Sequence, residues 1–286
     1  MRHAYLIIAH ADFELLENLL SVLDYEDNDI FIHIDKKVSY DIKYNAKYSR
    51  IRCVPNSQRI DVVWGTDSQI QCELSLYKYA TECGYYDYFH LMSGVDMPIK
   101  TQKYIHDFFE KNKGKEFIGL MPNAWRTETK LMYYHFFISR PYPKTWKYYT
   151  HVGIVAIQKL LHLKRDDMGW KVLAKGANWA SLTHDAVMYI LLQESMIRKR
   201  FKHTMACDEV YKQTILMNSP FADNLYCKTD EYEGCMRLVD WKRGNPYVWA
   251  LKDWNEIMNS DKLFARKFGI AHMELVKKLT KHLKEE

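Results

Sequence analysis

The chain has 286 residues, of which 48% are hydrophobic and 27% are charged, and its formal net charge is +5. This composition excludes an intrinsically disordered chain and is sufficient for one large or two small domains. The basic excess is modest, so it fits an anionic ligand or a membrane surface better than a dedicated nucleic-acid binder. No stretch approaches the roughly 20 consecutive apolar residues that a membrane-spanning helix needs.

The cysteines and the N-terminal residues indicate a reducing compartment. The six cysteines form neither a CxxC pair nor a Cys/His spacing typical of a metal site. We therefore expect free thiols. The apolar run at residues 4–9 is too short for the core of a signal peptide and is soon followed by Asp12 and Glu14. The sequence therefore predicts a cytoplasmic protein.

The first 120 residues alternate apolar runs with helical patterns, which predicts an α/β fold with a doubly wound mixed sheet flanked by helices. Continuous apolar runs suit strands buried on both faces, and apolar residues at three- and four-residue spacing suit helices. The predicted strands are 4–9, 30–34, 51–54, 86–92 and 116–120, and the predicted helices are 13–23, 67–80 and a segment from about 101.

Polar side chains follow three of these predicted strands. Ligands of such open sheets bind beyond the carboxyl ends of the strands. His10 and Asp35 follow the first two strands, and Asp96 lies in the loop after the strand at 86–92. All three are candidate site residues. For His10 and Asp35 a capping histidine and a turn acid explain the pattern equally well.

Residues from about 122 to 167 change character, because aromatic side chains alternate with basic ones. A helix is expected at 151–163. Such a mixture can bind sugars, nucleic acid or a membrane surface, and a partly buried helical insertion explains it equally well. The residues concerned are Trp125, aromatic runs at 133–137 and 146–149, Arg126, Arg140, Lys144, Lys147, Lys164 and Arg165.

The stretch 204–219 places two adjacent carboxylates, Asp208 and Glu209, at the head of an apolar-periodic run that predicts a helix. One interpretation is structural: acids in the first turn of a helix are stabilised by its dipole and free N–H groups, with Asp208 as the cap. The other is functional: Glu209 is a general base held on a rigid helix start.

The remaining segments add a strand at 176–181, a helix from 183 to 193 and a polar, Lys-rich helix at 273–286. The sequence contains no Gly-rich phosphate loop, no GxSxG and no HExxH. Asp27 and Asp29 form a DxD pattern, which sugar-nucleotide enzymes use to hold a metal. It precedes the second strand rather than following it, so we interpret it as a loop.

Several blocks taken together resemble the core-2/I-branching N-acetylglucosaminyltransferase family, which also contains the protein xylosyltransferases. They follow the family's order and span nearly the whole chain, except for the basic-aromatic insertion. The blocks are residues 4–10, 13–14, 32–36, 62–64, 91–100, 176–179, 207–209, 239–241 and 264–268. The resemblance implies one GT-A-like domain over 1–286, with a nucleotide-binding half at 1–120, a helical insertion at 121–175 and an acceptor and catalytic half at 176–286.

The resemblance also implies inverting transfer from a UDP-sugar without a metal ion. Glu209 corresponds to the catalytic base. Arg243 and Lys267 correspond to the cations that bind the diphosphate. The uridine pocket corresponds to Ala9, His10, Asp35 and Trp64. The sugar and acceptor end corresponds to Asp96, Trp179 and Asp208. The chemistry is coherent, because an inverting transfer needs one base for the acceptor hydroxyl, and fixed cations can stabilise the leaving diphosphate.

The sequence thus predicts a metal-independent glycosyltransferase that moves N-acetylglucosamine or xylose from a UDP-sugar to a glycan or lipid-linked acceptor in surface polysaccharide synthesis. We expect no cofactor, no nucleic-acid partner and action at the cytoplasmic membrane face, with docking through the insertion. The alternative is a non-catalytic glycan- or nucleotide-binding protein on the same fold. Glu209 and Lys267 argue against it, because a binding protein needs no base.

Overall fold

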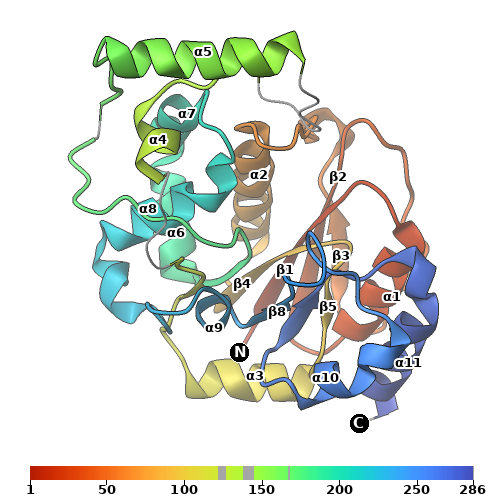
Figure 1. The fold of residues 1–286 in the computed structure, drawn as a ribbon. Coiled ribbons are helices and arrows are strands. Elements are labelled where there is room, and N and C mark those ends of the chain that lie inside the picture. Colours follow the sequence, from red (N-terminus) through yellow and green to blue (C-terminus); the bar gives the residue numbers. More distant parts are fainter. Residues whose placement is uncertain (122–126, 138–144, 167, 286) are drawn as a thin grey trace.

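The computed structural model describes residues 1–121, 127–137, 145–166 and 168–285. Its centre is a six-stranded sheet with the order β3-β2-β1-β4-β7-β6 (Figure 1). The first four strands in this order are parallel, whereas β7 is antiparallel to both β4 and β6. The predicted doubly wound mixed sheet is confirmed. The strands are β1 (His3–Ala9), β2 (Asn28–Ile34), β3 (Arg50–Cys53), β4 (Tyr88–Ser93), β6 (Phe117–Ile118) and β7 (Ala180–Thr183).

Helices cover both faces of this sheet because its central strands alternate between two cores. Leu6 of β1 packs in one core and Ile7 in the other, as period-two side-chain alternation requires. One core includes α2 (Ser68–Cys83), α6 (His184–Leu192), α7 (Glu194–Phe201) and α8 (Tyr211–Met217). The other includes α1 (Phe13–Leu23), α3 (Gln102–Lys111), α10 (Trp254–Asn259) and α11 (Met273–Glu285).

A second, three-stranded sheet has the order β5-β9-β8 and was not predicted from the sequence. Its strands, β5 (Met97–Pro98), β8 (Arg237–Val239) and β9 (Phe264–Arg266), are too short for a recognisable pattern. The backbone N–H of Phe268 also donates to the carbonyl of Val95 at 2.9 Å. The small sheet therefore brings the loop after β4 beside the segment that carries Lys267.

Most predicted elements are present with shifted ends, and two interpretations were wrong. The C-terminal helix is not simply polar, because Leu275, Val276 and Leu279 of α11 are buried in the core that contains α1. The DxD segment is not only a loop, because Asn28 begins β2. Asp29 is buried there and pairs with Arg2 at 3.0 Å, so it has a structural role.

The insertion contains α4 (Thr127–Met132) and α5 (Trp146–Leu160), and α9 (Glu231–Cys235) lies near β6 and β8. Of the basic and aromatic residues expected there, Trp125, Arg126, Arg140 and Lys144 lie outside the described residues. Arg165 is not a surface residue: it is buried and donates to the Thr204 hydroxyl at 2.8 Å. For Arg165 the interpretation as a buried part of a helical insertion is therefore confirmed.

Two further findings concern the whole described chain. All six cysteines carry free thiols, as expected. None of the helices within the described ranges combines the length and apolarity needed to cross a bilayer.

Candidate functional site

The carboxyl ends of β1, β2 and β4 meet where the sequence places its donor-binding residues. The Asp35 N–H donates to the Ala9 carbonyl at 2.9 Å, and the Gly94 N–H donates to the Ile8 carbonyl at 2.9 Å. A Cβ on Gly94 would stand 3.2 Å from that of Ala9, so the loop after β4 lies directly against β1. His10, just beyond this contact, is exposed.

Asp35 fixes a second loop to the same edge. Its carboxylate is buried and accepts hydrogen bonds from the backbone N–H groups of Lys37 at 2.9 Å and Val62 at 3.3 Å. Nε2 of His33, in β2, accepts from the Ile60 N–H at 2.8 Å. These bonds hold the loop that carries Trp64, whose side chain is 40% exposed. The four predicted uridine-pocket residues, Ala9, His10, Asp35 and Trp64, therefore lie at or beside one edge of the sheet.

Arg266 joins two predicted residues of the sugar and acceptor end. Its Nη1 lies 2.7 Å from Oδ1 of Asp96, and its guanidinium lies 4.6 Å from the ring centroid of Trp179. Asp96 is buried and also accepts from the Ser93 N–H at 2.7 Å. The sequence analysis did not select Arg266, although it adjoins Lys267. Asp96 therefore positions a cation that stacks on Trp179.

The two predicted diphosphate cations differ in availability. Arg243 pairs with Asp240, with Asp253 at 3.2 Å and with Glu256 at 2.8 Å, so its charge is compensated within the protein. Lys267 is half-buried, and its backbone is held by hydrogen bonds with Tyr247 and Trp249. Its ammonium group forms no ion pair with a residue that the structure describes. Lys267 is therefore the better placed of the two to bind an anion.

Glu209 lies at the end of a 3₁₀ turn, η2 (Cys207–Glu209), and faces two ammonium groups. Its Oε2 lies 2.9 Å from Nζ of Lys130 in α4 and 3.4 Å from Nζ of Lys175. The carboxylate side chain is 35% exposed, so it is held in place and still accessible. The sequence analysis did not predict either lysine.

The backbone at Glu209 is fixed as well. Its carbonyl accepts from the Gly176 N–H at 2.9 Å. Gly176 lies so close to Gly119 that a Cβ on it would approach the Gly119 carbonyl oxygen to 1.8 Å, so only glycine fits there. Close packing of two backbone segments thus sets the position of the candidate base.

The side chain of Asp208 is buried, whereas that of its neighbour Glu209 is partly exposed. Oδ2 of Asp208 accepts from Nε2 of Gln69 at 2.9 Å. Burial raises the pKa of Asp208 to about 7, with smaller contributions from the charges of Glu209 and Glu73. The interpretation of Asp208 as a helix cap is wrong, because α8 begins only at Tyr211 and Asp208 makes no cap hydrogen bond.

Lys212 and Glu73 form a fully buried ion pair next to this region. Nζ of Lys212 in α8 lies 2.5 Å from Oε2 of Glu73 in α2 and 2.5 Å from Oδ1 of Asn178. The Tyr211 hydroxyl donates to the same Glu73 oxygen at 2.6 Å. The pair therefore connects α2, α8 and the segment that carries Trp179.

We expect Lys212→Met to destabilise the protein by about 3–5 kcal/mol, because Glu73 would keep a buried charge without its ammonium partner. Urea unfolding measures the loss. The double variant Glu73→Met/Lys212→Met should lose much less, since no unpaired charge remains. Lys103→Met is the control, because Lys103 forms an exposed pair with Asp107. Equal effects of the two single lysine variants would contradict the prediction.

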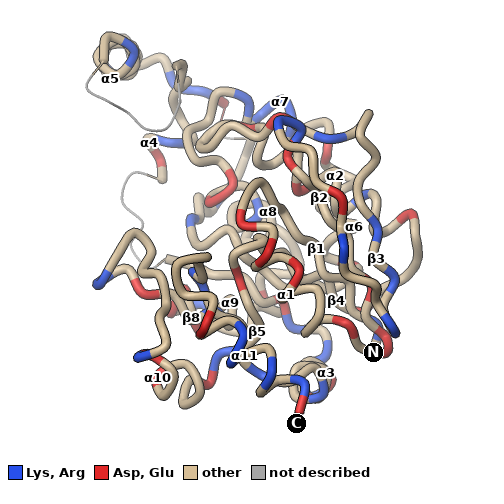
Figure 2. The backbone as a smooth tube through the Cα atoms, turned by 90° about the vertical axis from the view of Figure 1, so that its right-hand side faces the viewer, with Lys and Arg blue, Asp and Glu red and all other residues tan. Residues whose placement is uncertain are grey.

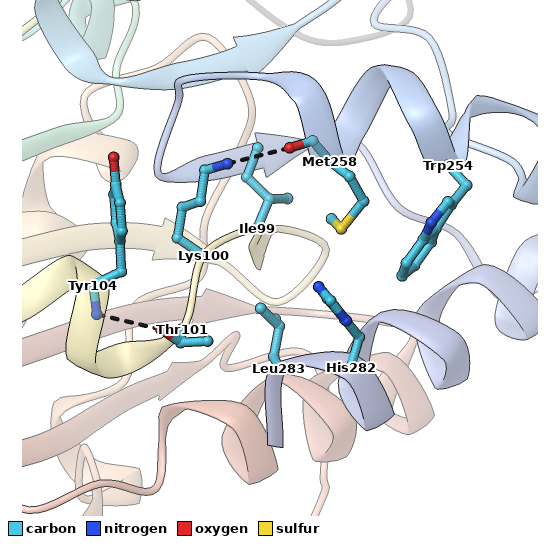
Figure 3. A pocket seen from close by; sticks show the side chains of 8 residues that line it. All are labelled: Ile99, Lys100, Thr101, Tyr104, Trp254, Met258, His282 and Leu283. Carbon is cyan, nitrogen blue, oxygen red and sulfur yellow. Dashed lines mark hydrogen bonds between the residues drawn. The ribbon is translucent and has the colours of Figure 1, made fainter. Parts of the chain in front are cut away.

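A separate pocket of about 420 Å³ lies between α3, α10 and α11 (Figure 3). Nζ of Lys100 donates there to the Met258 carbonyl at 3.3 Å. None of the predicted site residues lines it. Within the described part of the chain, no group of three His, Cys, Asp or Glu residues is arranged to hold a metal ion. The lining residues of the pocket are Ile99, Lys100, Thr101, Tyr104, Trp254, Met258, His282 and Leu283.

The six-stranded mixed sheet with helices on both faces, and with candidate ligand-binding residues beyond the ends of its parallel strands, fits a GT-A-like glycosyltransferase fold. The comparison with protein families identifies the group more closely. The family model described as Core-2/I-Branching enzyme matches residues 3–258, and the chain belongs to that family. The resemblance seen in the sequence is thereby confirmed.

The curated relatives have low sequence identity to this chain and are much longer than it is. Xylosyltransferase 2 of Rattus norvegicus is 24% identical over 317 residues, which cover 99% of this chain and 34% of the relative. Xylosyltransferase oxt of Drosophila pseudoobscura pseudoobscura is 25% identical over 282 residues, which cover 88% of this chain and 30% of the relative. The chain thus spans about a third of the length of these relatives.

Proposed function

We propose that this protein is an inverting glycosyltransferase that moves N-acetylglucosamine or xylose from a UDP-sugar to a hydroxyl of a glycan or lipid-linked acceptor, without a metal ion. We place its activity in surface polysaccharide synthesis at the cytoplasmic face of a membrane. The observation that carries the proposal is Glu209, an accessible carboxylate fixed by two lysines and by the backbone of Gly176. The family and the names of the relatives support transfer of a sugar.

We infer the chemistry of the site from these contacts. Glu209 takes the proton of the acceptor hydroxyl while that oxygen attacks the anomeric carbon of the donor, and the bond from that carbon to the UDP oxygen breaks. The proton transfer removes the negative charge of Glu209, so Lys130 and Lys175 are left with uncompensated positive charge. Negative charge grows on the leaving UDP in the same step, and Lys267 and these lysines favour it electrostatically.

UDP release from a panel of UDP-sugars, with and without excess EDTA, tests the proposal. We expect one donor, UDP-N-acetylglucosamine or UDP-xylose, to release UDP equally well in EDTA. Activity that EDTA abolishes and manganese restores would contradict metal independence. UDP binding without release from any donor, with glycan and lipid-linked acceptors supplied, would favour the alternative of a non-catalytic binding protein.

A further inference from the structure

Helix α5 has its polar side inward and its apolar side outward. Its two buried residues are His151 and Gln158, both polar. His151 and Gln158 bond to backbone groups of Phe136 and Tyr134, which fixes the polar face to the body of the protein. A helix that packs on a soluble core shows the reverse pattern, with apolar residues inward.

The outward face carries large apolar side chains along its whole length. Trp146 is 66% exposed and Leu160 is 77% exposed. In both overall views α5 lies at the periphery of the molecule, at the top (Figures 1 and 2). A contiguous exposed apolar surface of this kind marks a binding surface rather than a scattered set of side chains. The exposed apolar residues are Trp146, Tyr148, Tyr149, Val152, Ile157, Leu160, Leu161 and Leu163.

The charge of this region indicates the kind of partner. Helix α5 contains two Lys residues and no Asp or Glu. Lys147 and Lys159 are exposed on α5 itself, and Figure 2 shows basic but no acidic colour on this helix. Apolar and aromatic side chains bordered by lysines are typical of a helix that lies in the interface of an anionic bilayer. A second copy of the chain fits poorly, because pairing of two such helices would oppose lysines without any acid.

The anchoring of α5 also connects this surface to the candidate base. Arg165, just beyond α5, donates to Thr204 and to the carbonyl of Lys202. The His135 N–H donates to the His203 carbonyl at 2.8 Å. The segment so held, residues 202–204, leads into η2, which ends at Glu209. Lys130 of α4 contacts Glu209 from the same insertion.

We propose that α5 is an interfacial helix that docks this protein on an anionic lipid bilayer, with its apolar face among the lipids and its lysines at the headgroups. Docking in this way brings the membrane surface to the insertion that contacts Glu209. It therefore favours an acceptor carried by a lipid. This last point rests on the proposed function, whereas the bilayer contact does not.

Co-sedimentation of the full chain with vesicles tests the bilayer contact, using phosphatidylcholine alone or mixed with phosphatidylglycerol. We expect binding to the mixed vesicles. The combined variant Trp146→Gln/Tyr149→Gln/Ile157→Gln/Leu160→Gln should weaken it at least about tenfold, because its apolar side chains no longer enter the lipid. Lys147→Gln and Lys159→Gln should each weaken it about fivefold.

The matched control removes exposed apolar side chains elsewhere. Leu192 is 82% exposed, and Tyr85 and Ile270 are also exposed. The variant Tyr85→Gln/Leu192→Gln/Ile270→Gln should bind vesicles like the unmodified protein. Equal vesicle binding by the α5 variant would overturn the proposal. Absence of binding to mixed vesicles would also overturn it, and self-association that the α5 variant abolishes would then assign the surface to a second copy.

UDP release with a water-soluble acceptor separates this proposal from the proposed function. The α5 variant should retain that release, because none of its four substituted residues belongs to the candidate site. Vesicle binding without UDP release by the unmodified protein would support the bilayer contact and contradict the proposed function. UDP release without vesicle binding would contradict the bilayer contact and support the proposed sugar transfer.

Discussion

Glu209→Gln is expected to lower turnover by about a hundred- to ten-thousandfold while leaving UDP affinity within a few-fold. Glutamine keeps the size of the side chain and an oxygen that can accept from Lys130, which now lies 2.9 Å from the carboxylate. It cannot take the proton of the acceptor hydroxyl. Steady-state UDP release measures turnover, and calorimetry measures UDP binding.

The control for this variant is Glu128→Gln. Glu128 is an exposed acid on α4 that pairs with Lys164 at 2.8 Å. It should leave turnover unchanged. If Glu209→Gln retained turnover while Glu128→Gln behaved as expected, Glu209 would not be the base. Asp208 would then be the next carboxylate to test, although its burial makes it less accessible.

Acidification below pH 6.5 is expected to destabilise the protein strongly, because buried histidines must remain neutral. Burial lowers the pKa of His33 to about 4 and holds the pKa values of His3 and His90 well below 6.5. Between pH 6.5 and 4 the unfolded chain binds protons that these folded histidines exclude, so their contribution to stability is complete above pH 6.5 and is lost as pH falls. The raised pKa values of Asp208 and Glu116, both about 7, act in the opposite direction and offset part of this loss. His33 alone accounts for about 3 kcal/mol across this range.

Urea unfolding from pH 7.5 to 4.5 measures the slope of the free energy of unfolding against pH, and His33→Gln isolates the contribution of one histidine to this slope. The glutamine oxygen can still accept from the Ile60 N–H, so the loop that carries Trp64 keeps its anchor. The slope should decrease by the share of one histidine. His162→Asn is the control, because His162 is exposed and its φ of 53° is tolerated by asparagine. A slope unchanged in His33→Gln would contradict the prediction.

The main sheet could be predicted because its strands are continuous apolar runs and its helices have regular apolar spacing. The residues after β1, β2 and β4 could be predicted as site candidates for a topological reason, since parallel strands end at one edge. The small sheet could not, because two- and three-residue strands carry no periodicity. The capping interpretation of Asp208 was wrong because a buried acid and a capping acid look alike in sequence.

The contacts of Glu209, the candidate base, could not be predicted from the sequence for a different reason. Lys130 is 79 residues from Glu209 in sequence, and it lies in a segment with no family block. Lys175 directly precedes the block at 176–179, so its neighbourhood was recognisable but its partner was not. Arg266 lies in the block 264–268, but only the fold shows that it contacts both Asp96 and Trp179. Pairings of this kind are fixed by tertiary structure alone.

The contact between α4 and Glu209 also bears on how such proteins diverge. The insertion that presents an apolar, basic surface at α5 also supplies the ammonium group closest to the candidate base. Replacing the insertion by recombination would therefore change the proposed membrane-docking surface and the charges around Glu209 in a single event. A chimera that keeps the sheet and exchanges residues 127–165 should therefore differ in turnover as well as in membrane binding.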